Sequence, residues 1–205
     1  MQITWHGLNC VRLQIKDVTI LIDPLAPTVG VSAPRMQADL FVFSSTENPQ
    51  YGKALKSGVF TIAAPGEYEV RGVVINGIAI NQPGGHPLTI YTFEAEGMVL
   101  GHLGALGVAI NGPQVEKLKD IDALLIPVGG KPVLSAKQAT ELLSVLEPRV
   151  VLPIYYRIPG LSLRLDGVEP FLKELGVKNV EPQEKIRLVK KELPEEEMRV
   201  LLLKA

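Results

Sequence analysis

The sequence predicts an α/β sandwich, in which two β-sheets pack face to face and helices cover the outside. Two observations lead to this fold class. The first half of the chain is a series of short strand-like segments, whereas the second half alternates helices with strands. That order is typical of layered α/β folds. No linker or repeat divides the 205 residues, so we expect a single domain over residues 1–205.

Short segments rich in β-branched residues predict the strands of the first half. Residues 11–15 alternate apolar and polar side chains, as a half-buried strand does, and Lys16-Asp17 then indicates a tight hairpin. Prolines and glycines indicate a loop over residues 25–37 and a turn over residues 83–87. Further strands are predicted over residues 3–5, 18–22, 40–43, 59–63, 88–94 and 98–103, and a hairpin or bent strand pair over residues 69–80.

Two continuous apolar runs, residues 123–127 and 150–154, are typical of strands covered on both faces. Ser135 is a plausible N-cap for a helix that extends to about Leu146, with apolar side chains on one face. Shorter helices are predicted over residues 114–119 and 168–175, and late strands over residues 186–189 and 199–203. A polar loop is predicted to follow the strand at residues 40–43.

Composition excludes several classes of protein. The net charge of −1 provides no basic field for nucleic acid. No apolar run approaches the ~18 residues that cross a membrane, and the first residues do not have the pattern of a signal peptide. The lone Cys10 excludes an internal disulfide and the usual cysteine zinc sites. We therefore expect a cytoplasmic protein without nucleic-acid or membrane partners.

Five stretches together resemble the metallo-β-lactamase superfamily, in particular its small bacterial proteins similar to ascorbate-phosphate lactonases. The resemblance covers nearly the whole chain in the expected order. It implies a four-layer αββα sandwich of two mixed sheets with outer helices. The stretches are Ile3-Thr4-Trp5-x-Gly7, Val18 to Pro24, Ala38-Asp39-Leu40, Pro65 to Val70, and His102-Leu103-Gly104-x-Leu106-Gly107 followed by Leu125 to Gly130.

The resemblance also locates the family's metal ligands, and other residues stand at those positions here. The family's His-x-His-x-Asp-His cluster and its three later ligands match Ser45, Glu47, Pro49, Gln50, Gln82, Ala105 and Tyr155. A zinc site needs about three or four protein ligands, which this set does not supply. His86 lies in a Gly/Pro turn and is expected to be a poor substitute. We therefore expect no zinc and no other cofactor.

Several of these residues have alternative roles in the former metal pocket. Glu47 is either a general acid or base or a solvated loop carboxylate. Tyr155 either fills the space of the metal or hydrogen-bonds a ligand, with Arg157 nearby for a phosphate or carboxylate. His102 is expected to be a hydrogen-bonded structural residue or a ligand-binding one. Asp23 is retained from the family's Ile-Asp-Pro, where it lies close to the site.

A catalytic serine is not expected. Ser44 and Ser45 have no surrounding elbow motif and no histidine adjacent in the sequence. The glycines of residues 101–107 have neither a Walker lysine nor Rossmann spacing, so a nucleotide loop is not expected either.

Three functions follow from this pattern. The leading hypothesis is a degenerate, metal-free pseudoenzyme that acts by binding a small polar ligand or by assembly with itself or a protein partner. The alternative is a hydrolase of a small lactone or phosphorylated sugar, with Glu47, Tyr155, Arg157 and His102 in a non-standard or metal-independent site. The third is a structural subunit of a homo-oligomer whose edge strands pair between chains.

Overall fold

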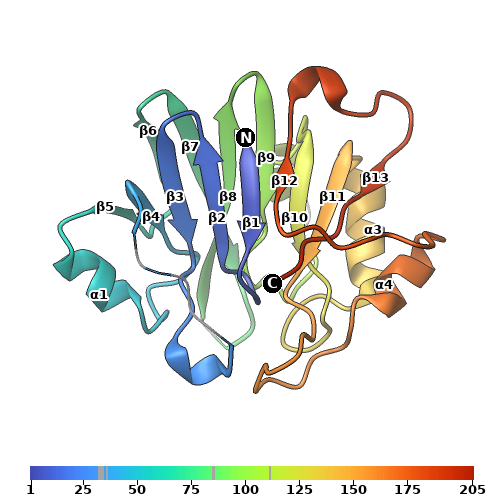
Figure 1. The fold of residues 1–205 in the computed structure, drawn as a ribbon, viewed down its shortest axis with the longest axis horizontal. Helices are drawn as coiled ribbons and strands as arrows, with labels where there is room; N and C mark the ends of the chain where they lie inside the picture. The colour runs from blue at the N-terminus through green and yellow to red at the C-terminus, as the bar shows by residue number, and fades with distance from the viewer. Residues whose placement is uncertain (32–34, 36, 85, 111) are drawn as a thin grey trace.

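Two β-sheets form the centre of the chain in the computed structural model, which describes residues 1–31, 35, 37–84, 86–110 and 112–205 (Figure 1). The first sheet has the strand order β12-β1-β2-β3-β4-β5 and the second has the order β13-β11-β10-β9-β8-β7-β6. The strands are β1 Gln2–Trp5, β2 Val11–Ile15, β3 Val18–Ile22, β4 Leu40–Val42, β5 Phe60–Ile62, β6 Gly66–Val70, β7 Val73–Asn81, β8 Pro87–Ala95, β9 Met98–His102, β10 Ala123–Pro127, β11 Val150–Ile154, β12 Ile186–Arg187 and β13 Arg199–Val200.

Short helices lie outside the sheets. In Figure 1, α1 lies beside β5 at one side of the molecule, and α3 lies beside β11 at the other, with α4 packed against α3. The helices are α1 Tyr51–Lys56, α2 Gly112–Glu116, α3 Ala136–Leu146 and α4 Glu169–Glu174, with 3-10 turns at Pro27–Val29 and Lys190–Glu192. No helix among the described residues is long and apolar enough to span a membrane.

Both sheets are mixed, so the predicted fold class, a sandwich of two mixed sheets with outer helices, is confirmed. β3, β4 and β5 run parallel in the first sheet, and β9, β10, β11 and β13 run parallel in the second, whereas the other pairings are antiparallel. Every residue of β10 and β11 is buried, as their continuous apolar runs predicted. The core lies between the sheets and beneath the helices.

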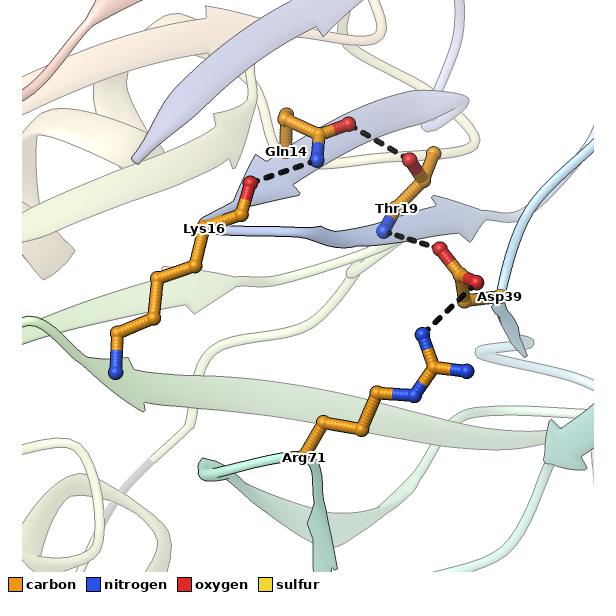
Figure 2. Close-up of polar contacts among 5 residues, drawn as sticks. All are labelled: Gln14, Lys16, Thr19, Asp39 and Arg71. Carbon is orange, nitrogen blue, oxygen red and sulfur yellow. Dashed lines mark hydrogen bonds and ion pairs between the residues drawn. The ribbon is translucent and has the colours of Figure 1, made fainter.

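The edge of the sandwich at the β2–β3 hairpin is held by exposed polar contacts (Figure 2). Gln14 Oε1 accepts from Thr19 Oγ1 at 2.6 Å, and Asp39 Oδ2 accepts from the Thr19 N–H at 2.9 Å. Arg71, from the turn between β6 and β7, donates to Asp39 Oδ1 at 3.1 Å and so connects the two sheets. Lys16 has φ +53°, which lets the hairpin close without a glycine.

Three predictions of secondary structure needed correction. The polar loop after β4 leads into α1, a helix that was not predicted. Its N-cap residue, Gln50, makes no side-chain capping bond. The helix predicted over residues 114–119 ends at Glu116, and the late strands are two residues long. The loop at residues 25–37 and the turn at residues 83–87 each include positions outside the described residues (32–34, 36 and 85).

Candidate functional site

A cavity of about 240 Å³ opens at the end of the sandwich opposite the hairpin of Figure 2. Five of the seven positions matched to family ligands line it, namely Ser45, Glu47, Gln82, Ala105 and Tyr155. They come together because β3, β4 and β11 end there and β8 begins there. The other lining residues are Asn9, Asp23, Ser44, Asn48, His86, Pro87 and Leu88.

Asp23 is a buried carboxyl group at this cavity. Its Oδ1 accepts the Ser44 N–H at 2.7 Å, and its Oδ2 accepts from Asn9 Nδ2 at 2.7 Å. Burial raises the pKa of Asp23 to about 6, although the hydrogen bonds from Ser44 and Asn9 act in the opposite direction. Asp23 therefore keeps its proton to a higher pH than an exposed aspartate does.

Three non-glycine residues around the cavity have left-handed backbones: Leu8 (φ +48°), Asp23 (φ +44°) and Tyr155 (φ +54°). Such conformations are unfavourable and persist where the surrounding structure holds them. The Tyr155 N–H donates to the Leu8 carbonyl at 2.9 Å, and that carbonyl also accepts from Trp5 Nε1 at 2.8 Å. A Cβ at Gly129 would lie 2.2 Å from the Tyr155 carbonyl oxygen, so this glycine is needed for the chain to pass there.

Tyr155 is 9% exposed and lines the cavity. Among the described residues, its hydroxyl has no hydrogen-bond partner. Burial raises the pKa of Tyr155, and the negative charge of Asp23 raises it further, so the phenol stays protonated. Tyr155 therefore provides a hydroxyl donor at this cavity.

Glu47 and His86 form a pair that the sequence did not predict. His86 Nδ1 lies 3.0 Å and 3.2 Å from the two carboxylate oxygens of Glu47, and both side chains are more than half exposed. We expected His86 to be a poor substitute for a ligand because it lies in a turn. The turn before β8 brings it to the loop after β4, 39 positions away in the chain, and no local pattern signals that contact.

His102 is fully buried and is not among the residues that line the cavity. Its Nε2 lies 3.0 Å from the Asn9 carbonyl oxygen, and its Nδ1 accepts the Gly104 N–H at 3.2 Å. These partners assign the proton to Nε2 of a neutral ring, and burial lowers the pKa of His102 to about 4. His102 therefore supports the loop that carries Asn9.

Three predicted positions do not offer a side chain to a ligand in this cavity. Gln50 is buried, and its Nε2 donates to the Leu25 carbonyl at 3.1 Å, whereas Pro49 is exposed outside the lining. Gln82 lines the cavity, but its Oε1 accepts the Gly107 N–H at 2.8 Å.

Arg157 does not serve the same cavity as Tyr155, contrary to our prediction. The chain turns after Tyr155, the Arg157 N–H donates to the Asp166 carbonyl at 2.8 Å, and the Arg157 side chain lines a different cavity. The left-handed backbone of Tyr155 redirects the chain at this point.

The side chains of this cavity do not fit the family's zinc ligand set. Both oxygens of Asp23 already accept hydrogen bonds, and Glu47 and His86 pair with each other. Over the part of the chain that the structure describes, no group of three or more His, Cys, Asp or Glu side chains is arranged to hold a metal ion. The absence of zinc and of any other cofactor stays a prediction.

Comparison with known proteins identifies the relatives of this chain. The family model described as a beta-lactamase superfamily domain matches residues 2–155. A solved structure from Thermotoga maritima, titled as a proposed Zn-dependent hydrolase of the metallo-beta-lactamase superfamily, is 31% identical, covers 98% of each chain and has a TM-score of 0.80. A Methanopyrus kandleri relative named a UPF0173 metal-dependent hydrolase is 24% identical, over 86% of this chain and 94% of the relative. A UPF0173 protein of Pyrococcus abyssi is 25% identical, over 88% and 93% of the two chains.

These relatives contradict the pseudoenzyme hypothesis. A protein similar along nearly the whole chain is titled a hydrolase, and further relatives are named metal-dependent hydrolases. The interpretation of a degenerate protein that acts only by binding or assembly is therefore wrong, and the hydrolase alternative fits better. The error came from judging function by the ligand positions alone, since the cavity also holds Asp23 and His86.

Proposed function

Because this chain belongs to the metallo-β-lactamase superfamily, we propose that it is a hydrolase whose reaction takes place in the cavity lined by Asp23, Glu47, His86 and Tyr155. One observation carries this proposal. A paired Glu–His and a phenol without a hydrogen-bond partner among the described residues border one small cavity. A base and a hydrogen-bond donor facing a common space are the minimal equipment of metal-independent hydrolysis.

The Glu47–His86 pair supplies the base. The contact to Glu47 engages His86 Nδ1 and leaves Nε2 free to accept a proton from a water molecule. That water attacks the carbonyl carbon of a cyclic ester, and His86 returns the proton to the ring oxygen when the C–O bond breaks. Glu47 orients the ring and stabilises its charged form, as a carboxylate does in a hydrolytic triad.

Tyr155 supplies the donor. A carbonyl oxygen becomes negatively charged during attack, and a positioned O–H group stabilises that charge best when water is excluded. The phenol is 9% exposed and its backbone is held by the Leu8 carbonyl, so the group is already oriented before a substrate arrives. Asp23 acts indirectly, because it holds Asn9 and the Ser44 backbone at the base of the cavity.

A small uncharged lactone fits this cavity better than a phosphorylated sugar. The volume of about 240 Å³ lies below the usual range for drug-sized ligands. Among the described lining residues there is no Lys or Arg, whereas Asp23 and Glu47 both carry carboxyl groups. A phosphate would therefore meet negative charge without a cation to balance it.

The test is a hydrolysis assay of the purified chain with a panel of γ- and δ-lactones and matched sugar phosphates. We expect turnover of lactones only, and a loss of about 10²–10³-fold in kcat for Tyr155→Phe because one oxyanion donor is removed. Glu47→Gln and His86→Gln are expected to lose about 10²–10⁴-fold.

Two control variants make the same changes as Tyr155→Phe and Glu47→Gln, but at residues outside the cavity. Tyr51→Phe alters a phenol that packs against Phe43, and Glu67→Gln removes an exposed carboxylate on β6. Both should retain the wild-type rate. Equal loss in the control and cavity variants would locate the reaction elsewhere.

A further inference from the structure

A second cavity, of about 540 Å³, lies beside the candidate site and shares no lining residue with it among the described residues. It is formed where three segments meet: the end of β1, the chain after β11, and the last residues of the chain. Tyr155 lines the first cavity and the adjacent Tyr156 lines the second.

The wall of this cavity is aromatic and aliphatic. The rings of Trp5 and Tyr156 lie 4.7 Å apart with a 40° tilt, and Ile158 and Leu202 extend the apolar surface. The polar atoms of both rings are used by the protein, because Trp5 Nε1 donates to Leu8 and Tyr156 Oη donates to the Leu203 carbonyl at 3.3 Å. Both rings are nearly buried, so they support the wall, and the apolar surface open to a ligand comes from Ile158, Pro159 and Val168.

Cations border this apolar wall. Arg157 and Lys204 both line the cavity, and among the described lining residues there is no Asp or Glu. Within the described part of the chain, neither side chain forms an ion pair. Glu169 lies near Arg157, since a Cβ at Gly167 would lie 2.0 Å from Glu169 Oε2 and 3.5 Å from Arg157 Nη2, so it offsets part of the arginine's charge. Arg157 and Lys204 are therefore the lysine and arginine side chains that a ligand meets in this lining.

His6 adds an unsatisfied polar atom at the same place. Its Nε2 is buried and has no hydrogen-bond partner among the described residues. Burial lowers the pKa of His6, and the charge of Arg12 lowers it further, so the ring is neutral at physiological pH. Unpaired buried nitrogens are rare in folded proteins, and a bound polar group is one way to satisfy them.

We propose that this cavity binds a small organic acid with an apolar body, whose carboxylate pairs with Arg157 and Lys204 while its apolar part packs against Ile158 and Pro159, above the ring of Tyr156. Charge complementarity identifies the class of ligand, because an anionic head matches the two free cations and an apolar body matches the wall. The ligand's carboxylate would thus be the anion that pairs with Arg157, in this cavity and not in the first.

The experiment is calorimetric titration of the full chain with octanoate and with 4-phenylbutyrate, each compared with its neutral amide. Trp5 is the only tryptophan in the sequence, so its fluorescence reports on occupancy of this cavity. We expect saturable binding of at least one acid, about tenfold weaker binding of its amide, and a change in Trp5 emission with the same midpoint.

Arg157→Gln should weaken binding of the acid about tenfold and leave binding of the amide unchanged. Arg164→Gln makes the same change at an exposed arginine outside the cavity and should have no effect. Failure of both acids to bind would overturn the proposal. So would equal affinity for acid and amide, or equal effects of the two arginine variants.

Discussion

Two aspartates at opposite ends of the parallel strands β3 and β4 have similar partners and different behaviour. Asp23 follows β3 and Asp39 precedes β4, and each accepts a backbone N–H, from Ser44 and Thr19 respectively. Burial raises the pKa of Asp23, whereas the Thr19 N–H lowers the pKa of the exposed Asp39. Solvent access, more than hydrogen bonding, therefore sets the pKa of these two aspartates and distinguishes the candidate site from the structural edge.

Removal of the Asp23 carboxylate should destabilise the protein far more than removal of the Asp39 carboxylate. Asp23→Ala leaves the Ser44 N–H and the Asn9 amide without their acceptor in a buried place, so the free energy of unfolding should fall by about 2–4 kcal/mol. Asp39→Ala breaks an exposed ion pair and should lower it by less than about 1 kcal/mol. Urea unfolding at pH 7 measures the loss of stability in both variants. Equal losses would show that the buried and the exposed aspartate contribute alike.

The pH dependence of stability should also differ in sign. Asp23 has a raised pKa in the folded state, so its favourable contribution is complete below about pH 4 and is lost as the pH rises through about 6, a change of about 2–3 kcal/mol. Asp39 has a lowered pKa, so its contribution is present above the unfolded pKa and is lost as the pH falls.

Urea unfolding of the wild type and of Asp23→Asn between pH 4 and 7 tests this linkage. The variant should lack the decline in stability between pH 4 and 6 that Asp23 causes in the wild type. Identical slopes in the two proteins would mean that Asp23 has an ordinary pKa.

Two left-handed residues extend the comparison between an exposed edge and the buried site. Lys16→Gly, at the exposed hairpin, relieves φ +53° and should raise the free energy of unfolding by about 0.5 kcal/mol. Tyr155→Gly relieves a similar φ but removes a buried phenol, so it should lower that free energy by about 3 kcal/mol. Thermal unfolding of the pair distinguishes them, and stabilisation by both changes would show that Tyr155 is held under strain alone.

The sequence predicted the parts of the fold that depend on local pattern. The strands at residues 123–127 and 150–154 have the predicted bounds, and Ser135 caps α3 through a capping box with Gln138. α1 was missed because it is six residues long and has no side-chain cap.

The sequence predicted less of the candidate site, because the missing contacts are not local. Resemblance to the family located Tyr155 and Glu47, which line the cavity, but not the pairing of Glu47 with His86 from another loop. The Arg157 side chain lines the other cavity because the left-handed backbone of Tyr155 redirects the chain. The residue types in this segment do not reveal that change of direction.

The most direct test of the account is lactone hydrolysis by protein treated with EDTA, with and without added zinc, together with elemental analysis of the same samples. We expect the rate of lactone hydrolysis to be undiminished in EDTA and to gain nothing from zinc, because His86, Glu47 and Tyr155 carry the reaction. Loss of activity in EDTA and its return with about one or two zinc ions per chain would contradict the account and assign the reaction to a metal centre.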